Sequence, residues 1–192
     1  MTTTKKLIVL LSGPIAVGKT SLREKLISDF DFHTIQSSTY LKDLATTRKI
    51  DPTRHNLQEL GDSLDRESNF RWIVDNVALP LISSNPSYSR WIIDAVRKPE
   101  QVEHFRDAFG DSVLHVHLTS TEEILESRYN ARKKSENSSD RNIPYNEVTS
   151  HPNEQCSRSL ITLANIVIDT SKLSPLEAAN HICKKLKINT IN

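Results

Sequence analysis

Short apolar runs alternate along this chain with longer segments whose apolar residues recur at helical spacing. The unbroken run at residues 7–11 contains only leucine, isoleucine and valine, as expected for a strand that is buried on both faces. Similar runs predict further strands at 32–35, 91–94, 113–118 and 166–169. Helical spacing predicts helices at 20–29, 40–48, 53–65, 72–81, 99–109, 120–132 and from 175 onward. This alternation predicts an α/β fold with a parallel sheet that helices cover on both faces.

The predicted topology also indicates where a functional site should lie. Sites in parallel α/β sheets form at the carboxyl ends of the strands. The loops after Leu11, Ile35, Asp94 and Leu118 are therefore the places to search. A length of 192 residues suits one domain, so we expect residues 1–192 to form a single unit.

The loop after the first strand carries the strongest motif of the chain. Residues 13–20 fit G-x-x-x-x-G-K-[ST] without a mismatch, between a predicted strand and a predicted helix. Glycines allow the backbone to wrap a phosphate, and the helix N-terminus adds its positive end. Lys19 is expected to reach the β- and γ-phosphates, and the Thr20 hydroxyl to bind Mg²⁺. The expected nucleotide contacts are Gly13, Ile15, Ala16, Val17, Gly18, Lys19, Thr20 and Ser21.

The same loop occurs in switch GTPases, whose other motifs do not fit here. The stretch 48–51, Arg-Lys-Ile-Asp, only partly matches a guanine-reading element. It precedes the strand at 91–94, which is the wrong chain order, and no D-x-x-G follows. We therefore set a GTPase aside.

Charged residues near the other strand ends are candidates for the remaining chemistry. Asp94 ends the third strand, where a carboxylate could hold Mg²⁺ or accept a proton from an attacking oxygen. Arg97 follows three residues later and could clamp a phosphate of the acceptor. Arg54 and Gln58 share a helix face at i and i+4, and Arg48 lies in the same region. We expect Arg48, Arg54, Gln58 and Arg97 to bind the acceptor, the first three from an acceptor lobe at about residues 36–82.

The helix after the fourth strand and the loop that follows it are typical of a lid. Arg128 and Arg132 lie at i and i+4 on that helix, and the residues after it, 133–140, are all polar. A closing basic segment would surround the transferred phosphoryl group with positive charge. We expect a lid at about 128–145, with Lys19, Asp94, Arg128 and Arg132 as the catalytic set. His115 and His117 alternate along the strand and are expected to be packed or hydrogen-bonded, because no metal-ligand spacing surrounds them.

Composition narrows the possible partners. Lys and Arg number 25 and Asp and Glu 24, so the net charge of +1 argues against binding nucleic acid polymers or anionic membranes. No apolar run reaches the length of a membrane span, and the first apolar run lacks a cleavage-site pattern. The two cysteines, Cys156 and Cys183, form no disulfide framework or metal-type spacing. We expect a cytoplasmic protein, monomeric or homodimeric, with a small-molecule nucleotide substrate.

Taken together, these residues resemble the nucleoside monophosphate kinase group. The resemblance rests on the phosphate loop, the stretch 57–62 (Leu-Gln-Glu-Leu-Gly-Asp), the strand end 94–97 (Asp-Ala-Val-Arg), and 115–118 (His-Val-His-Leu) with Arg128 and Arg132. Phage-type deoxynucleoside monophosphate kinases, and the kinase module sometimes joined to adenylosuccinate synthetases, are the most similar members. Animal-type phosphomevalonate kinases share a similar Asp-to-Arg strand end.

The resemblance implies a P-loop NTPase fold with five parallel strands in the order 2-3-1-4-5, an acceptor lobe and a lid. It also implies ATP, Mg²⁺ and a phosphate-bearing acceptor. In the phage-type enzymes the arginine follows the aspartate by two residues, whereas Arg97 follows Asp94 by three. This difference concerns the identity of the acceptor, not the phosphoryl transfer. From the resemblance, nucleoside or deoxynucleoside monophosphates are the first hypothesis for the acceptor. A nucleoside or a small metabolite phosphate, or a non-catalytic ATP-binding module, are the alternatives.

Overall fold

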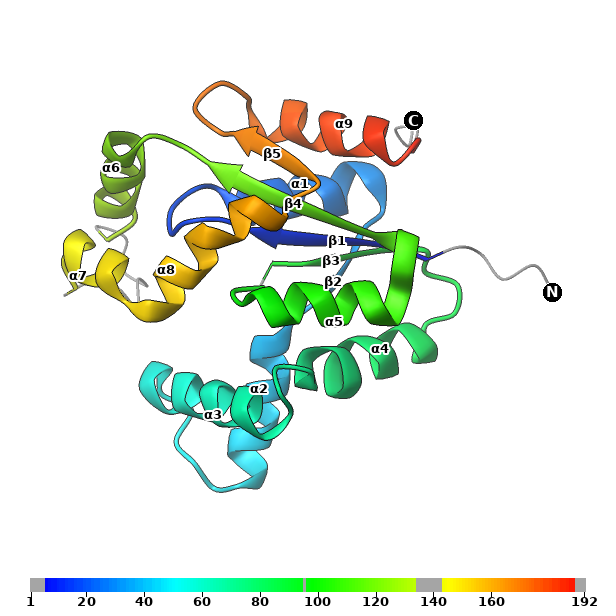
Figure 1. Cartoon of the computed structure of the whole chain (residues 1–192), viewed down its shortest axis with the longest axis vertical. Coiled ribbons are helices and arrows are strands. Elements are labelled where there is room, and N and C mark those ends of the chain that lie inside the picture. Colours follow the sequence, from blue (N-terminus) through cyan, green and yellow to red (C-terminus); the bar gives the residue numbers. More distant parts are fainter. Residues whose placement is uncertain (1–5, 95, 134–142, 189–192) are drawn as a thin grey trace.

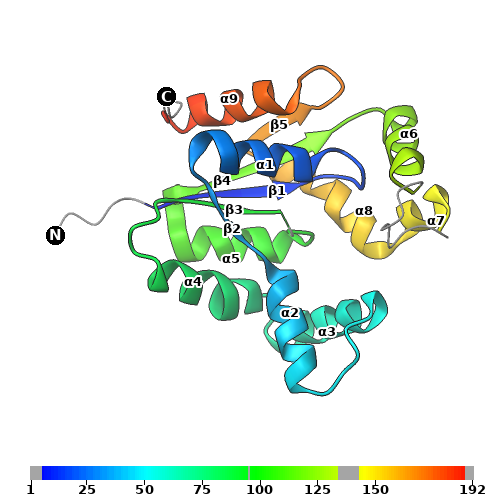
Figure 2. The ribbon, with the colours of Figure 1, turned by 180° about the vertical axis from the view of Figure 1, so that it is seen from behind.

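A computed structural model of the chain describes residues 6–94, 96–133 and 143–188. Five parallel strands form one sheet in the order β2-β3-β1-β4-β5, which confirms the predicted topology. Helices cover both faces of the sheet (Figures 1 and 2). The strands are β1 (Leu7–Ser12), β2 (His33–Ile35), β3 (Arg90–Ile93), β4 (Val113–Thr119) and β5 (Ile166–Asp169).

The predicted helices are present, and two further helices occur before the last strand. Gly110 ends α5, and Ser174 forms a capping box with Glu177 at the start of α9. The helices are α1 (Lys19–Phe30), α2 (Ser37–Thr47), α3 (Arg54–Glu67), the π-helical η1 (Ile73–Ala78), α4 (Leu79–Ser84), α5 (Pro99–Phe109), the 3₁₀ turn η2 (Gly110–Ser112), α6 (Glu122–Lys133), α7 (Tyr145–Ser150), α8 (Pro152–Ser159), the 3₁₀ turn η3 (Leu160–Leu163) and α9 (Pro175–Lys185).

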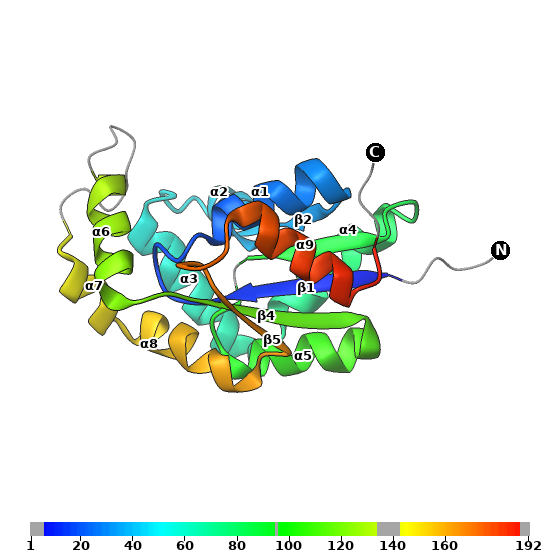
Figure 3. The ribbon, with the colours of Figure 1, turned by 90° about the horizontal axis from the view of Figure 1, so that it is seen from above.

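The sheet separates two apolar cores, because successive side chains of each strand point to opposite faces. Val9 and Leu11 of β1 pack in the core under α1 and α9, together with Leu22 and Ile182. Ile8 and Leu10 pack in the opposite core, which α5, η1 and α3 complete. Seen from above, α1 and α9 lie on one side of the strands and α5 and α8 on the other (Figure 3). No helix that the structure describes is long and apolar enough to cross a bilayer.

Two groups of helices extend beyond these layers at the carboxyl ends of the strands. Helices α2 and α3 project away from the sheet, and α6, α7 and α8 lie beyond the end of β1 (Figure 1). Of the segment predicted as the acceptor lobe, 36–82, only α2 and α3 project. The helix formed by η1 and α4 packs into the core with α5. Residues 134–142, most of the predicted lid, lie outside the described residues.

A close backbone contact fixes the loop that leaves β1. Gly13 has φ +132°, and a Cβ atom there would lie 2.4 Å from the carbonyl oxygen of Leu118. Such a separation is far shorter than van der Waals contact, and the oxygen belongs to the backbone of β4. The site therefore requires glycine both for its dihedral angle and for the lack of a side chain. The loop is thereby held against the carboxyl end of β4.

Replacing this glycine should disrupt the fold. We expect Gly13→Ala to lower the free energy of unfolding by about 3 kcal/mol or more, from the clash and the strained φ. Gly61→Ala is the matched control, because a Cβ there meets only Leu41 Cδ1 at 3.6 Å within α3. Removing a helical glycine should stabilise by about 0.5–1 kcal/mol. Urea denaturation of both variants measures the difference, and equal effects would contradict the close approach at Gly13.

Candidate active site

The loop between β1 and α1 has the shape of an anion-binding nest. Gly18, the N-cap of α1, has φ +100°, and Ala16 has φ +63°. These left-handed dihedral angles turn successive N–H groups toward one side of the loop. As a glycine, Gly18 has no side chain to cap the first N–H groups of α1. Those donors and the positive end of the helix are therefore directed at a ligand in the loop.

Lys19 lies across this loop rather than extending into solvent. Its Nζ donates to the carbonyl oxygens of Gly13 at 2.6 Å and of Pro14 at 2.9 Å. Burial lowers the pKa of Lys19 to about 8, and the nearby carboxylate of Glu154 opposes that shift. Positive charge on Arg97 and Arg132 lowers the pKa further, and Asp94 raises it. The ammonium thus lies among charged groups from the segment after β3, from α6 and from α8. The sequence predicted the first two of these.

Asp94 faces the loop, and its carboxylate Oδ2 forms an ion pair with Nη1 of Arg23. Both side chains are about one-fifth exposed, at 20% for Asp94 and 21% for Arg23. Arg23 was not predicted as a site residue, although its position four residues after Lys19 places it on the same helix face. This ion pair couples α1 to the end of β3.

The residues predicted to hold Mg²⁺ suit that ion when phosphates are also present. No group of three or more His, Cys, Asp or Glu side chains that could hold a metal occurs in the described part of the chain. Thr20 is exposed in the first turn of α1, and Asp94 supplies one carboxylate. Mg²⁺ is commonly bound through one or two protein oxygens together with substrate phosphates and water. The donor set therefore fits a metal that arrives with a nucleotide.

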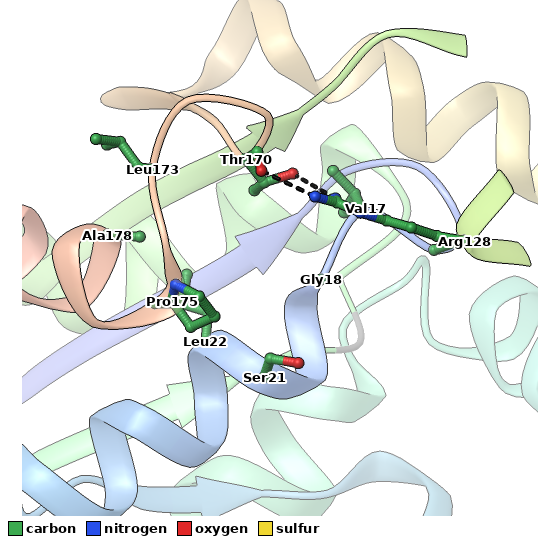
Figure 4. Close-up of a pocket in the computed structure, with 10 residues that line it drawn as sticks. Val17, Gly18, Ser21, Leu22, Arg128, Thr170, Leu173, Pro175 and Ala178 are labelled. Atoms are coloured by element: carbon green, nitrogen blue, oxygen red, sulfur yellow. Dashed lines mark hydrogen bonds between the residues drawn. The ribbon is translucent and has the colours of Figure 1, made fainter. Parts of the chain in front are cut away.

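A pocket of about 290 Å³ opens beside the loop, between α1 and the segment that follows β5 (Figure 4). Arg128 of α6 spans it and donates to Thr170, from Nη1 to Oγ1 at 2.9 Å and from Nη2 to the carbonyl oxygen at 2.9 Å. Arg128, predicted as a lid residue, is therefore bound here to the pocket rim. The lining residues are Ala16, Val17, Gly18, Ser21, Leu22, Arg128, Thr170, Leu173, Pro175 and Ala178.

The predicted acceptor residues lie on the opposite side of Lys19, with one exception. Arg54 at the start of α3 is near Arg132 of α6, and its positive charge is among the causes that lower the pKa of Arg132, after burial. The guanidinium of Arg132 lies 5.6 Å from the centre of the Tyr129 ring. Arg97 is exposed after β3, within electrostatic reach of Lys19. Arg48 is exposed just beyond the end of α2.

Helix α8, which was not predicted from the sequence, packs against the phosphate loop. Glu154 Oε1 accepts a hydrogen bond from the Ile15 N–H at 2.8 Å, and Ser157 Oγ donates to the Gly13 carbonyl at 3.1 Å. At the start of the helix, His151 Nε2 lies 2.9 Å from the side-chain amide nitrogen of Gln58 in α3. Pro152 at the first helical position was the available sequence signal.

A buried hydrogen-bond network positions the backbone at Arg97. The Asp65 carboxylate accepts from Trp72 Nε1 at 2.7 Å and from Gln101 Nε2 at 3.2 Å. Gln101 Oε1 in turn accepts from the N–H groups of Arg97 at 2.9 Å and Lys98 at 3.2 Å. Burial raises the pKa of Asp65, and the two donors oppose that shift. The network ties α3 to the loop that carries Arg97.

The two strand histidines form a buried cluster beneath the phosphate loop. Ser12 Oγ lies 2.7 Å from His115 Nε2 and 2.9 Å from His117 Nδ1, and all three residues are at most 2% exposed. Burial lowers the pKa of each histidine to about 4, and positive charge on Lys19 contributes at His117. These histidines are hydrogen-bonded in the core, as predicted.

Comparison with known proteins assigns the chain to a family. Residues 9–170, from β1 to the loop after β5, match the sequence model of the AAA domain family. The chain belongs to the AAA domain family. The match includes the phosphate loop, the arginines of α6 and the whole of α8. A search of curated proteins gave no match.

Solved structures, two of them kinases by name, share the fold over nearly their whole length. An unliganded sugar kinase from Janibacter sp. HTCC2649 has a TM-score of 0.52 at 18% identity and covers 95% of both chains. Shikimate kinase from Aquifex aeolicus has 0.54 at 13% identity, covering 94% of this chain and 96% of that one. The tunicamycin resistance protein of Deinococcus radiodurans has 0.55 at 15% identity, with 97% and 99% covered. The chain therefore has the P-loop kinase fold, and the acceptor class stays a prediction.

The histidine cluster should make stability depend on pH. The folded protein keeps His115 and His117 neutral down to about pH 4, whereas the unfolded chain binds protons below about pH 6.5. The free energy of unfolding should therefore fall as the pH drops from 6.5 toward 4, by up to about 1.4 kcal/mol per pH unit for each histidine.

Urea denaturation at several pH values measures this slope. His117→Asn should reduce the slope, because one buried histidine no longer titrates on unfolding. His181→Asn, at an exposed position on α9, is the control and should leave it unchanged. Equal slopes in all three proteins would contradict the assignment of the pH dependence to this cluster.

Proposed function

We propose that this protein transfers the terminal phosphoryl group of ATP, with Mg²⁺, to a small phosphate-bearing acceptor, a nucleoside or deoxynucleoside monophosphate. The observation that carries the proposal is the placement of Lys19. On one side of the loop is the largely apolar pocket that Arg128 borders. The charged groups of Asp94, Arg97 and Arg132 are near enough to Lys19 to shift its pKa. A nucleoside donor and an anionic acceptor could thus meet at one ammonium group.

The residues around the loop divide the work of such a transfer. The loop N–H groups and Lys19 would bind the donor phosphates, and the pocket would hold the nucleoside. Thr20 and Asp94 would hold Mg²⁺, which neutralises charge on the phosphates when bound. Arg132 would stabilise the charge that develops on the transferred group, and Arg97 and Arg54 would orient the acceptor. This reaction needs positioning and electrostatic stabilisation more than covalent chemistry, so these residues suffice.

The charges on the acceptor side favour an acceptor that carries a phosphate. Arg54, Arg97 and Arg132 approach that region from α3, the loop after β3 and α6. Guanidinium groups bind phosphate through paired hydrogen bonds and remain charged at all relevant pH values. A second candidate, a kinase for a small metabolite, is supported by the names of structures with this fold, a sugar kinase and a shikimate kinase.

An assay of the purified protein tests this proposal. ATP and Mg²⁺ are supplied with a panel of ribo- and deoxyribonucleoside monophosphates, and with sugars, shikimate and phosphorylated metabolites, while ADP and the second product are measured. We expect turnover on a monophosphate, and a fall of about a hundredfold or more in Lys19→Ala. Turnover on an unphosphorylated metabolite alone would support the second candidate. Tight ATP binding without any turnover would indicate a non-catalytic module.

Arg97 provides a sharper test of the acceptor side. Arg97→Ala should raise the KM for the acceptor about tenfold or more while leaving the affinity for ATP nearly unchanged, because a charge-assisted contact to the acceptor alone is lost. Arg66→Ala, an exposed arginine of α3, is the control and should change neither value. Equal losses of acceptor and ATP affinity in Arg97→Ala would place this side chain at the donor instead.

A further inference from the structure

A carboxylate of the chain itself binds a backbone N–H of the phosphate loop. Glu154 Oε1 accepts from the Ile15 N–H at 2.8 Å, and the Glu154 side chain is only 13% exposed. That N–H belongs to the anion nest described above, where hydrogen bonds to an anion are stronger than those to a neutral acceptor. Glu154 therefore makes the type of contact that a phosphate oxygen makes with such a loop.

The position of this contact along the loop indicates which phosphate it would replace. Ala16, Val17 and Gly18 line the nucleoside-side pocket, whereas the preceding residue, Ile15, directs its N–H to α8. The first turn of α8 contacts the projecting helix α3 through His151 and Gln58, so this N–H is on the side of the predicted acceptor lobe. Glu154 is also close enough to Lys19 to raise the pKa of that lysine against the effect of burial. The carboxylate therefore lies where the donor phosphates end and the acceptor begins.

Neighbouring side chains on α6, α7 and α8 provide Glu154 with a second partner. Arg158 Nε donates to the same Oε1 atom at 3.2 Å, and Arg158 also pairs with Glu122 and hydrogen-bonds to the Tyr145 hydroxyl at 3.2 Å. If Glu154 leaves the Ile15 N–H, its charge can remain paired with Arg158. Displacement would therefore not leave a buried, unpaired carboxylate, which is a costly arrangement.

We propose that Glu154 sets the preference of the site between triphosphate and diphosphate, by occupying the place of the terminal phosphoryl group on the Ile15 N–H. This inference rests on the proposed function, because it assumes that the loop binds a nucleotide. A diphosphate leaves the Glu154 contact in place. A triphosphate must displace the carboxylate and then lies beside its negative charge, so Glu154 weakens triphosphate binding selectively.

Equilibrium binding without an acceptor tests the inference. Glu154→Gln retains the size of the side chain and an oxygen that can accept from the Ile15 N–H, but removes the charge. Calorimetric titration with a non-hydrolysable ATP analogue and with ADP, both with Mg²⁺, gives the two dissociation constants. We expect Glu154→Gln to bind the triphosphate about fivefold more tightly, with ADP affinity within twofold, since hydrogen bonds to charged groups exceed neutral ones by about 1 kcal/mol.

Two matched variants separate this effect from others. Glu126→Gln removes the same charge from an exposed position on α6 and should leave the ratio of the two dissociation constants unchanged. Ser157→Ala removes the other contact of α8 with the loop without changing charge, and should affect both nucleotides equally. A thermal melt of each variant confirms that it is folded.

The outcomes for Glu154 and for the proposed function are distinct. An unchanged or lower preference for the triphosphate in Glu154→Gln, in a protein that binds both nucleotides, overturns the role of Glu154 and leaves the proposed function intact. Failure of both the natural protein and Glu154→Gln to bind either nucleotide overturns the proposed function, and this inference with it. Triphosphate binding that is measurable only in Glu154→Gln supports both.

Discussion

The close approach of Gly13 to the carbonyl oxygen of Leu118 is the constraint on which the arrangement of the site depends. It holds the loop that leaves β1 against the end of β4, next to the point where the β1–β4 register sets Ser12 beside His115 and His117. Beneath the loop these three side chains are buried, and their burial lowers the pKa of both histidines and so keeps them neutral near pH 7. On its other side, the loop presents its N–H groups and Lys19 to the space where a phosphate would bind.

Charge balance around Lys19 is the second feature that the fold creates. Arg97 approaches from the loop after β3 and Arg132 from α6, with Arg54 of α3 near Arg132, and Asp94 and Glu154 are the carboxylates that offset these charges. A cluster of cationic side chains attracts anions. In the protein without ligand, Asp94 and Glu154 supply the negative charge that bound phosphates would otherwise provide. A phosphorylated substrate would therefore replace contacts that these carboxylates make, rather than bind to cationic side chains that have no anionic neighbour.

Helix α8 connects the parts that surround this charge cluster. It contacts the phosphate loop through Glu154 and Ser157, α6 through Arg158, and the projecting helix α3 through the pair His151 and Gln58. The Asp65 and Gln101 network joins the same projecting helix to the backbone of Arg97. The donor loop and the acceptor side are thus linked by two separate sets of polar contacts, both of which include α3.

The sequence by itself determined the sheet, its covering helices and the phosphate loop, because these follow from local patterns of apolar residues, glycines and caps. Only the tertiary structure decided which charged side chains meet at the loop. Arg23 and Glu154 reach the site from positions where a lone charge on a helix is usually solvated, and their partners are 71 and 139 residues away in the chain. Arg48 and Arg54 are close in sequence, yet Arg54 lies near Arg132 of α6, whereas Arg48 is exposed beyond the end of α2. Contacts between residues so far apart in the chain depend on how the helices and strands pack, and a local sequence pattern does not predict them.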